Sequence, residues 1–254
     1  MELLYSQITN YLKEAGKELT GLQGNIADIG VTKTHLTEQD LKIERTLTRL
    51  VQDRYPTHVI YAEEEHDAFT DASDIWVFDP ISATRAFIEG RPHYASVVSH
   101  IHDGQTQFAA VYDPSADELF TARAGKGAFL NGRPIHVSGA TRRVLQNIAF
   151  SRYDQPQSVA LRQATEDFDP LRNEVSFAVN YCWVADGRFD GVVSFSKDAF
   201  PEFAGELIIH EAGGKFTNID GGTVQPDDRV FIGGNTEIYD ELMSRAQEQL
   251  SKIG

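Results

Sequence analysis

The hydrophobic positions of the chain follow two spacings, which predicts a mixture of helices and short buried strands. Apolar residues recur every three or four positions from about Leu3 to Leu22 and from Leu36 to Val51, and this spacing is typical of helices with one buried face. Short runs of β-branched and aromatic residues follow at Val59–Ala62 and Ile75–Asp79, and they predict strands. The polar segment Glu65–Asp74 between them is interpreted as a loop.

The second part of the pattern predicts a hairpin, further strands and two more helices. His93–His102 and Thr106–Tyr112 flank Asp103-Gly104, a pair that is typical of a hairpin turn. Residues 139–173 are polar and poorly periodic, so they predict no element. The other expected features are a strand at Glu118–Ala122, glycine-rich turns at Gly125–Gly132, apolar runs around Tyr181 and at Asp190–Phe195, a helix at about Pro201–Ala212, a strand from Val230 and a final helix to about Leu250.

Length and composition favour one large domain. The chain has 254 residues, of which 41% are hydrophobic and 24% charged, enough for a sizeable core. We expect a single domain over residues 1–254, with subregions at about 1–140 and 141–254. No apolar run reaches the length of a membrane span, and the start Met1-Glu-Leu-Leu-Tyr lacks the basic residues of a signal peptide, which predicts a cytoplasmic protein without a membrane partner.

Charge and cysteine content limit the possible partners. The single Cys182 excludes an internal disulfide and a cysteine cluster for zinc. A formal net charge of −15 argues against nucleic acid as a partner. It does not argue against a phosphorylated substrate, because a bound metal ion supplies local positive charge.

The segment from Ile75 to Gly90 carries the most chemical information. Asp79 stands at the end of a predicted buried strand, and Pro80 ends the ladder. A tight turn at residues 82–84 then leads into a segment that can be helical. Free backbone N–H groups at such a place favour phosphate. A carboxylate beside an anion site is reasonable if a metal ion lies between them.

This segment resembles the inositol monophosphatase family. Asp79-Pro-Ile-Ser-Ala-Thr84 is similar to the family motif Asp-Pro-Ile/Leu-Asp-Gly-Thr. Ala62-Glu-Glu64 is similar to Gly-Glu-Glu, and Thr37-Glu-Gln-Asp40 to Thr-x-x-Asp. Segments that also match are 110–132, 184–191 and 211–214. The matches cover most of the chain in the family's order, which implies an α+β fold layered as an α-β-α-β-α sandwich.

The resemblance implies a magnesium-dependent phosphatase site. It predicts Glu63, Asp79 and the backbone carbonyl of Ile81 as metal ligands, which are hard oxygen donors of the kind that Mg²⁺ prefers. It also predicts that Asp40 and Thr84 orient the attacking water, with Glu63 as a further catalytic residue. The expected partners are a small phosphorylated metabolite and a second copy of the chain, because members of the family are often homodimers.

Three departures from the family fall on its chemistry. Ser82 replaces the second aspartate of the turn. Pro201 falls on the metal aspartate of the later motif, which aligns with Phe200–Gly205. Ser194 stands where many members carry a glutamate that contacts substrate hydroxyls. Of the three carboxylates at the second metal, only Asp79 remains, so we expect one Mg²⁺ ion to be retained and the second site to be weak.

These departures leave several functions open. The first is a divergent member that binds Mg²⁺ and a small phosphorylated polyol or sugar, with phosphomonoester hydrolysis weak or lost. The alternatives are an active phosphatase with Glu202 or Asp198 as a substitute ligand, a repurposed enzyme such as a lyase or cyclase, and a non-catalytic regulatory protein. The residues expected to bind phosphate or substrate are Ser82, Ala83, Thr84, Ser194 and Glu202.

The same residues also allow purely structural interpretations. Glu63–Glu65 could be a solvated acidic loop, and Asp79 could cap a turn. Asp40 could cap a helix, and Thr84 could be an N-cap. Both kinds of role can hold together at one residue.

Overall fold

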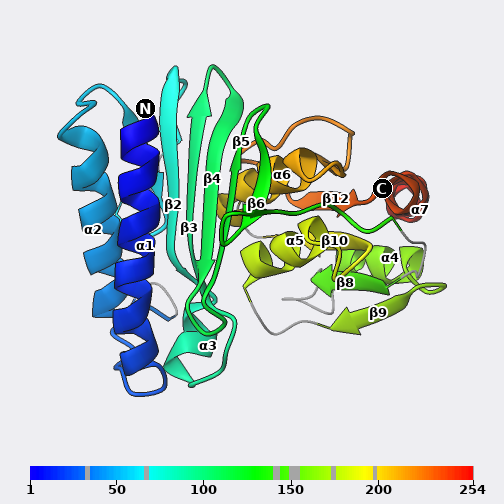
Figure 1. Cartoon of the computed structure of the whole chain (residues 1–254). Coiled ribbons are helices and arrows are strands. Elements are labelled where there is room, and N and C mark those ends of the chain that lie inside the picture. Colours follow the sequence, from blue (N-terminus) through cyan, green and yellow to red (C-terminus); the bar gives the residue numbers. More distant parts are fainter. Residues whose placement is uncertain are drawn as a thin grey trace.

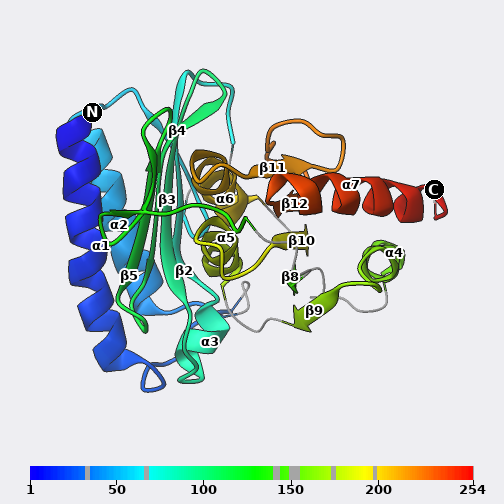
Figure 2. The same ribbon diagram turned by 45° about the vertical axis from the view of Figure 1, so that its right-hand side comes forward.

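The chain folds into five layers in which helices and sheets alternate (Figure 1). The computed structural model describes residues 1–31, 35–65, 69–139, 144–148, 155–172, 176–196 and 199–253, with only the backbone of 144–148 and 169–172. The N-terminus lies in the first layer and the C-terminus in the last (Figure 2). This order of layers confirms the predicted α-β-α-β-α sandwich.

The first two layers are a helix pair and a seven-stranded sheet. Helices α1 (Glu2–Leu22) and α2 (Glu38–Gln52) cover one face of this sheet. Strands β1 and β2 are parallel, and every later neighbour is antiparallel. In their order across the sheet the strands are β1 (Val59–Ala62), β2 (Asp74–Ser82), β3 (Ala95–His102), β4 (Gln105–Asp113), β5 (Glu118–Arg123), β6 (Gly127–Leu130) and β7 (Arg133–Pro134).

The remaining layers hold a second sheet between two further helix pairs. Helices α5 (Phe177–Ala185) and α6 (Phe200–Glu211) lie between the sheets, while α4 (Pro156–Ala164) and α7 (Thr236–Ser251) lie outside the second sheet (Figure 2). A short helix, α3 (Thr84–Ile88), follows β2. Across the second sheet the strands are β11 (Lys215–Asn218), β12 (Val230–Gly234), β10 (Gly191–Phe195), β8 (Val144–Ile148) and β9 (Asp169–Arg172).

Strand alternation divides the core between the two faces of the first sheet. Trp76 and Phe78 on β2 are fully buried against α1 and α2. Ile75 and Val77 on the same strand point to the opposite face and join the cluster formed by α5 and α6. Successive side chains of a strand point to opposite faces, so the next residue of this series, Asp79, points toward the α5 and α6 layer.

Most predicted elements agree with the structure, but several bounds and elements differ. The expectation that Pro80 ends the ladder is wrong, because β2 continues through Pro80 to Ser82, which pairs with Ala95. The strands β7 and β11 were not predicted, and the apolar run around Tyr181 forms the helix α5.

The predicted hairpin is formed by β3 and β4, although β3 begins at Ala95 and not at His93. Gly125–Gly132, expected to be only turns, contains β6. Residues 139–173, for which no element was predicted, contain β8, α4 and β9.

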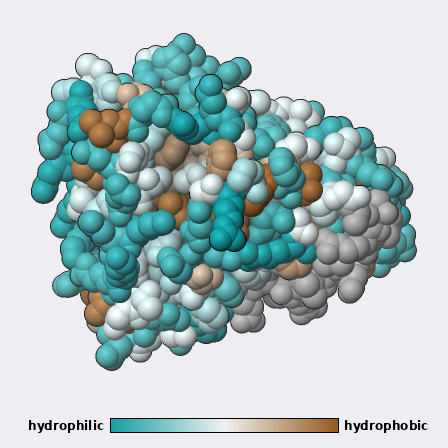
Figure 3. Space-filling view, viewed as in Figure 1, coloured by the Kyte–Doolittle hydropathy of each residue, from teal (hydrophilic) through white to brown (hydrophobic). Residues whose placement is uncertain are grey.

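One face of the molecule is mainly polar. The face in Figure 3 is mostly hydrophilic with small apolar areas, which is consistent with the formal net charge of −15. Among the described residues, no helix is both long and apolar enough to cross a membrane.

Candidate metal centre

The parallel pairing of β1 and β2 brings Glu63 beside Asp79. Ala62 pairs with Phe78 in the ladder, and the Glu63 backbone N–H donates to the Phe78 carbonyl at 3.2 Å. Each acidic residue directly follows a member of this pair, and the carboxyl ends of parallel strands meet at one edge of a sheet. Two of the predicted metal ligands therefore lie next to each other, with Asp79 only 5% exposed.

Tyr61 and Val77, each two positions before one of the acidic residues, lie on the face that α6 covers. Tyr61 of β1 stacks on Phe200 of α6, with ring centroids 4.4 Å apart. Strand alternation puts Asp79 on the same side of the sheet as Val77, and Glu63 directly follows β1, two positions after Tyr61. The N-terminal turn of α6, where the family carries its later aspartate, is thus packed against the strand that leads to Glu63.

The acidic loop is held by a buried glutamate that the sequence patterns did not identify. Glu44 of α2 is 0% exposed, and its carboxylate accepts hydrogen bonds from the backbone N–H groups of Glu64 at 2.9 Å and Glu65 at 2.8 Å. The exposed Glu65 carboxylate pairs with Arg45, as expected for a surface residue. The sequence feature that could have identified Glu44 is its position next to Ile43, on the apolar face of the predicted helix.

Asp40 caps a helix and also approaches Thr84. Its Oδ2 accepts hydrogen bonds from the Thr37 backbone N–H at 2.8 Å and the Thr37 hydroxyl at 2.6 Å, which forms a capping box. Its Oδ1 lies 3.5 Å from the Thr84 hydroxyl, which donates to the Ile81 carbonyl at 2.7 Å. The structure therefore brings together Asp40, Thr84 and Ile81.

The environment of Asp40 changes its acidity. Burial raises the pKa of Asp40 to about 7, although the hydrogen bonds from Thr37 oppose this, and the negative charges of Glu64 and Glu63 add to the rise. These charges act on Asp40 because the acidic loop lies close to it. The Asp40 carboxyl can thus exchange a proton near neutral pH.

The turn after β2 has a strained residue at its centre. Ala83, with φ 66° and ψ 47°, is the N-cap of α3 in the left-handed region, so the interpretation of Thr84 as N-cap is wrong. Ser82 is 6% exposed and pairs with Ala95 of β3 after a local shift in register. Since α3 spans only Thr84–Ile88, a helix dipole adds little here, and phosphate binding to the backbone of residues 82–84 stays a prediction.

A buried hydrogen-bonded trio joins two of the predicted substrate-binding residues, Ser194 and Glu202, through Tyr181. The Tyr181 hydroxyl of α5 donates to Glu202 Oε1 at 2.8 Å and lies 3.1 Å from Ser194 Oγ. All three side chains are completely buried. The sequence pattern shows Tyr181 only as part of an apolar run, because its hydrogen-bond partners lie 13 and 21 positions away in the sequence.

The replaced aspartate position has a structural role. Pro201 is buried in the first turn of α6, where its missing N–H has no helical partner to lose. It supplies no side-chain donor for a metal ion. Asp198, the other predicted substitute ligand, lies outside the described residues.

Comparison with known proteins gives the family. Residues 3–252 match the model of the inositol monophosphatase family. The chain belongs to this family. The "Inositol-1-monophosphatase" of Rhizobium meliloti is 30% identical over 250 residues, which are 93% of each chain. The "Nus factor SuhB" of Pseudomonas aeruginosa is 30% identical over 233 residues, 86% of this chain and 84% of that one.

Solved structures of the inositol monophosphatase family share the fold over the whole chain. An IMPase of Thermotoga maritima superposes with a TM-score of 0.85 at 26% identity and covers 100% of both chains. The inositol monophosphatase of Anabaena superposes with a TM-score of 0.80 at 26% identity, over 99% of this chain and 100% of that one. The layered α+β arrangement predicted from the sequence is therefore that of the family.

The donor set suits one hard cation. Glu63 directly follows β1 and Asp79 lies in the neighbouring strand β2, and both offer carboxylate oxygens. Ile81 offers a carbonyl whose second lone pair is not used by Thr84. These oxygen donors fit Mg²⁺. Ser82 and Pro201 add no carboxylate, so only Asp79 remains of the three carboxylates that the resemblance predicts around a second ion.

Proposed function

We propose that this protein is a divergent inositol monophosphatase family member that binds one Mg²⁺ ion and a small phosphorylated polyol or sugar. Glu63, Asp79 and the Ile81 carbonyl would hold the ion. Phosphomonoester hydrolysis would be weak or lost. The observation that supports this most is the β1–β2 register, in which Glu63 and Asp79 each directly follow a member of the Ala62–Phe78 pair. Neither Ser82 nor Pro201 supplies a carboxylate.

The residues of the chain itself define what can happen at the centre. A bound Mg²⁺ ion would polarise a phosphate oxygen and acidify a bound water. Thr84 and Asp40 form a hydroxyl–carboxyl pair at 3.5 Å that can orient a water and take its proton. The backbone N–H groups of Ser82, Ala83 and Thr84 would bind phosphate oxygens.

Loss of charge explains why turnover should be low. The family's second ion has three carboxylates, and here Asp79 is the only counterpart. A serine hydroxyl is neutral and proline has no side-chain donor, so a divalent ion would gain little compensation for its lost hydration shell. Without that ion, the leaving oxygen would develop negative charge with no electrostatic stabilisation.

An active phosphatase with a substitute ligand is the nearest alternative. Glu202 is the only candidate within the described residues, since Asp198 is outside them. Its carboxylate is 0% exposed and accepts a hydrogen bond from Tyr181. Metal binding through that oxygen would compete with this contact, which supports a structural role for Glu202.

Restoring the two aspartates tests the proposal. The double variant Ser82→Asp/Pro201→Asp should release phosphate from inositol or sugar phosphates in a Mg²⁺-dependent way, whereas the native protein should not. The matched control is Ser82→Asn/Pro201→Asn, which has the same shape without the charges and should stay inactive. Equal activity of the two double variants would contradict the role given to the missing carboxylates.

A non-catalytic regulatory role is the second candidate. Several relatives of about 30% identity carry the name Nus factor SuhB, which suggests that the fold can serve a function other than hydrolysis. This role, or a repurposed enzyme, is favoured if both the native and the restored protein fold but release no phosphate.

We also propose a homodimer, which light scattering would show as twice the chain mass of 28.3 kDa.

A further inference from the structure

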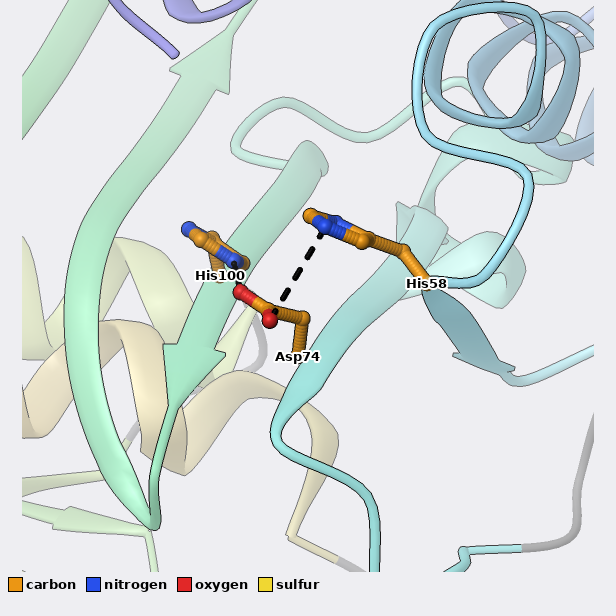
Figure 4. A group of neighbouring side chains, drawn as sticks. All are labelled: His58, Asp74 and His100. Carbon is orange, nitrogen blue, oxygen red and sulfur yellow. Dashed lines mark hydrogen bonds and ion pairs between the residues drawn. The ribbon is translucent and has the colours of Figure 1, made fainter.

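A second group of metal-ligand side chains lies at the opposite end of β2 from Asp79. Asp74 begins this strand, and His58 precedes β1 (Figure 4). In the β2–β3 ladder Trp76 pairs with His100 and Asp74 with His102, so Asp74 and His100 are diagonal neighbours on one face. Five residues of extended strand separate Asp74 from Asp79, which is about 16 Å.

The three side chains converge on one small volume. His100 Nε2 lies 3.1 Å from Asp74 Oδ1, and His58 Nε2 lies 3.9 Å from Asp74 Oδ2. The three ligand atoms are all within 4.8 Å of one another. The side chains of His100, His58 and Asp74 are only 4%, 10% and 19% exposed, so the group is a partly enclosed site.

We propose that His58, Asp74 and His100 form a binding site for a divalent transition metal such as Zn²⁺. Two imidazoles and a carboxylate are typical ligands of zinc, nickel or copper, whereas Mg²⁺ prefers oxygen donors. The site would be separate from the candidate magnesium centre in both place and chemistry, and it does not depend on the proposed function.

The surroundings of His100 suit a metal ligand. Its Nδ1 lies 2.8 Å from the Tyr5 hydroxyl, so when Nε2 binds a metal the ring proton can sit on Nδ1 and be donated to Tyr5. Such a second hydrogen bond orients most metal-bound histidines. Burial lowers the pKa of His100 to about 4, although Asp74 opposes this, so the ring is neutral at neutral pH and needs to lose no proton.

His58 must move when the metal binds. Its Nδ1 accepts a hydrogen bond from the Trp76 indole N–H at 3.1 Å, which places the proton of the neutral ring on Nε2. Binding through Nε2 shifts that proton to Nδ1, where it would face another donor, so the ring must turn away from Trp76. A tetrahedral zinc brings neighbouring ligand atoms to about 3.3 Å, less than 1 Å closer than His58 and Asp74 are now.

This rearrangement supplies an optical signal. Trp76 also stacks on the His100 ring, with centroids 4.5 Å apart, and the chain has only two tryptophans. In a Trp183→Phe background, Trp76 is the only indole. Paramagnetic Ni²⁺ or Co²⁺ bound beside it should quench its fluorescence, while Zn²⁺ should change its intensity without such quenching.

The test uses Ni²⁺ and Zn²⁺ titrations of the Trp183→Phe protein. We expect saturable quenching by Ni²⁺ with one equivalent at this site and a rise of a few degrees in Tm with excess Zn²⁺. Asp74→Asn and His58→Gln should each weaken Ni²⁺ quenching at least tenfold. His58→Gln changes a residue outside the strands, so it tests the site even if a change in β2 or β3 prevents folding.

Two control variants separate this site from other metal binding. His35→Gln changes an exposed histidine that pairs with Asp28 at 3.0 Å, and it should leave Ni²⁺ quenching unchanged. Glu63→Gln, at the candidate magnesium centre, should also leave it unchanged. Three results would overturn the proposal: quenching that survives Asp74→Asn, quenching that disappears with Glu63→Gln, and no quenching in the Trp183→Phe protein itself.

Discussion

At the scale of single residues, Ala83 has a strained, left-handed backbone conformation in the turn between Asp79 and Thr84. Its φ of 66° and ψ of 47° are unfavourable for a residue with a Cβ, by roughly 1–2 kcal/mol. The family motif carries glycine at this place. We expect Ala83→Gly to raise the free energy of unfolding by about 0.5–1 kcal/mol, since part of the relief is offset by the greater freedom of glycine in the unfolded chain.

Urea unfolding of native protein and variant measures this effect. The matched control is Ala86→Gly in α3, which replaces a helical alanine and should lower stability by about 1 kcal/mol or more. A loss of stability for Ala83→Gly as large as that of the control would show that strain at Ala83 is absent.

Glu206 is a buried acid that should make stability depend on pH. Burial raises the pKa of Glu206 from 4.5 to about 7, against the lowering effect of the hydrogen bond from the Val224 N–H. The folded state holds this proton more tightly than the unfolded chain does. Its contribution to stability is therefore complete below about pH 4.5 and is lost as the pH rises to about 7.

Glu206→Gln removes the titration but keeps an oxygen for the Val224 N–H, which now donates to Glu206 Oε1 at 3.0 Å. We expect the variant to match the native protein near pH 4.5 and to be more stable by about 1–3 kcal/mol at pH 8. Chemical denaturation at a series of pH values measures the difference, and a difference that does not change with pH would refute this account.

At the scale of elements, one hydroxyl joins three of them. Tyr181 of α5 contacts Glu202 of α6 and Ser194 of β10, so it fixes the helices between the two sheets. Tyr181→Phe would leave a buried carboxylate without this donor, and we expect it to lower the free energy of unfolding by about 1–3 kcal/mol. Tyr239→Phe is the matched control, because the Tyr239 hydroxyl bonds to Thr217 at a less buried place, and it should cost about 1 kcal/mol or less.

A double-mutant cycle shows whether this cost arises from the Glu202 contact. Tyr181→Phe should destabilise the Glu202→Gln protein less than the native protein, because an amide is easier to leave buried than a carboxylate. Additive effects would mean that the hydroxyl and the carboxylate are not coupled.

The elements that the sequence predicted well are those whose pattern is local. The local spacing of apolar residues is enough to predict the two N-terminal helices and the strand β1, and the structure contains all three. The strand β8, Val144–Ile148, was missed because the polar residues Gln146 and Asn147 interrupt its apolar pattern. It is a strand through its parallel pairing with β10 and β9, which no local propensity encodes.

Within the candidate site, the sequence motifs identified the predicted metal and catalytic residues, but not the buried residues that hydrogen-bond to the segments around them. Glu63, Asp79 and Thr84 belong to short motifs, so the resemblance to the family found them. Glu44 and Tyr181 act through contacts across 13 to 21 positions of sequence, and only the fold reveals such contacts. The roles of all these residues in binding stay predictions.

At the scale of the whole molecule, the two sheets share one core through α5 and α6. Val77 and Val111 of the first sheet belong to the same cluster as Val192 and Phe231 of the second. We therefore expect residues 1–254 to unfold as a single cooperative unit. Unfolding followed by Trp76 in Trp183→Phe and by Trp183 in Trp76→Phe should each coincide with the circular dichroism of the same variant. Two separate midpoints within one variant would instead indicate independent subregions.

The central claim is that the candidate metal centre retains one Mg²⁺ site and has lost the second. The most direct test of this claim is phosphate release by the native protein. A panel of inositol and sugar phosphates would be tested with Mg²⁺ raised to high millimolar concentration. Asp79→Asn serves as the blank, because Asp79 is the predicted ligand of the first ion that is also the one remaining carboxylate of the second. The account predicts that the native protein releases phosphate no more than marginally faster than this blank. Rapid Mg²⁺-dependent release that Asp79→Asn abolishes would contradict it, and Glu202→Gln and Asp198→Asn would then show which acid completes the second site.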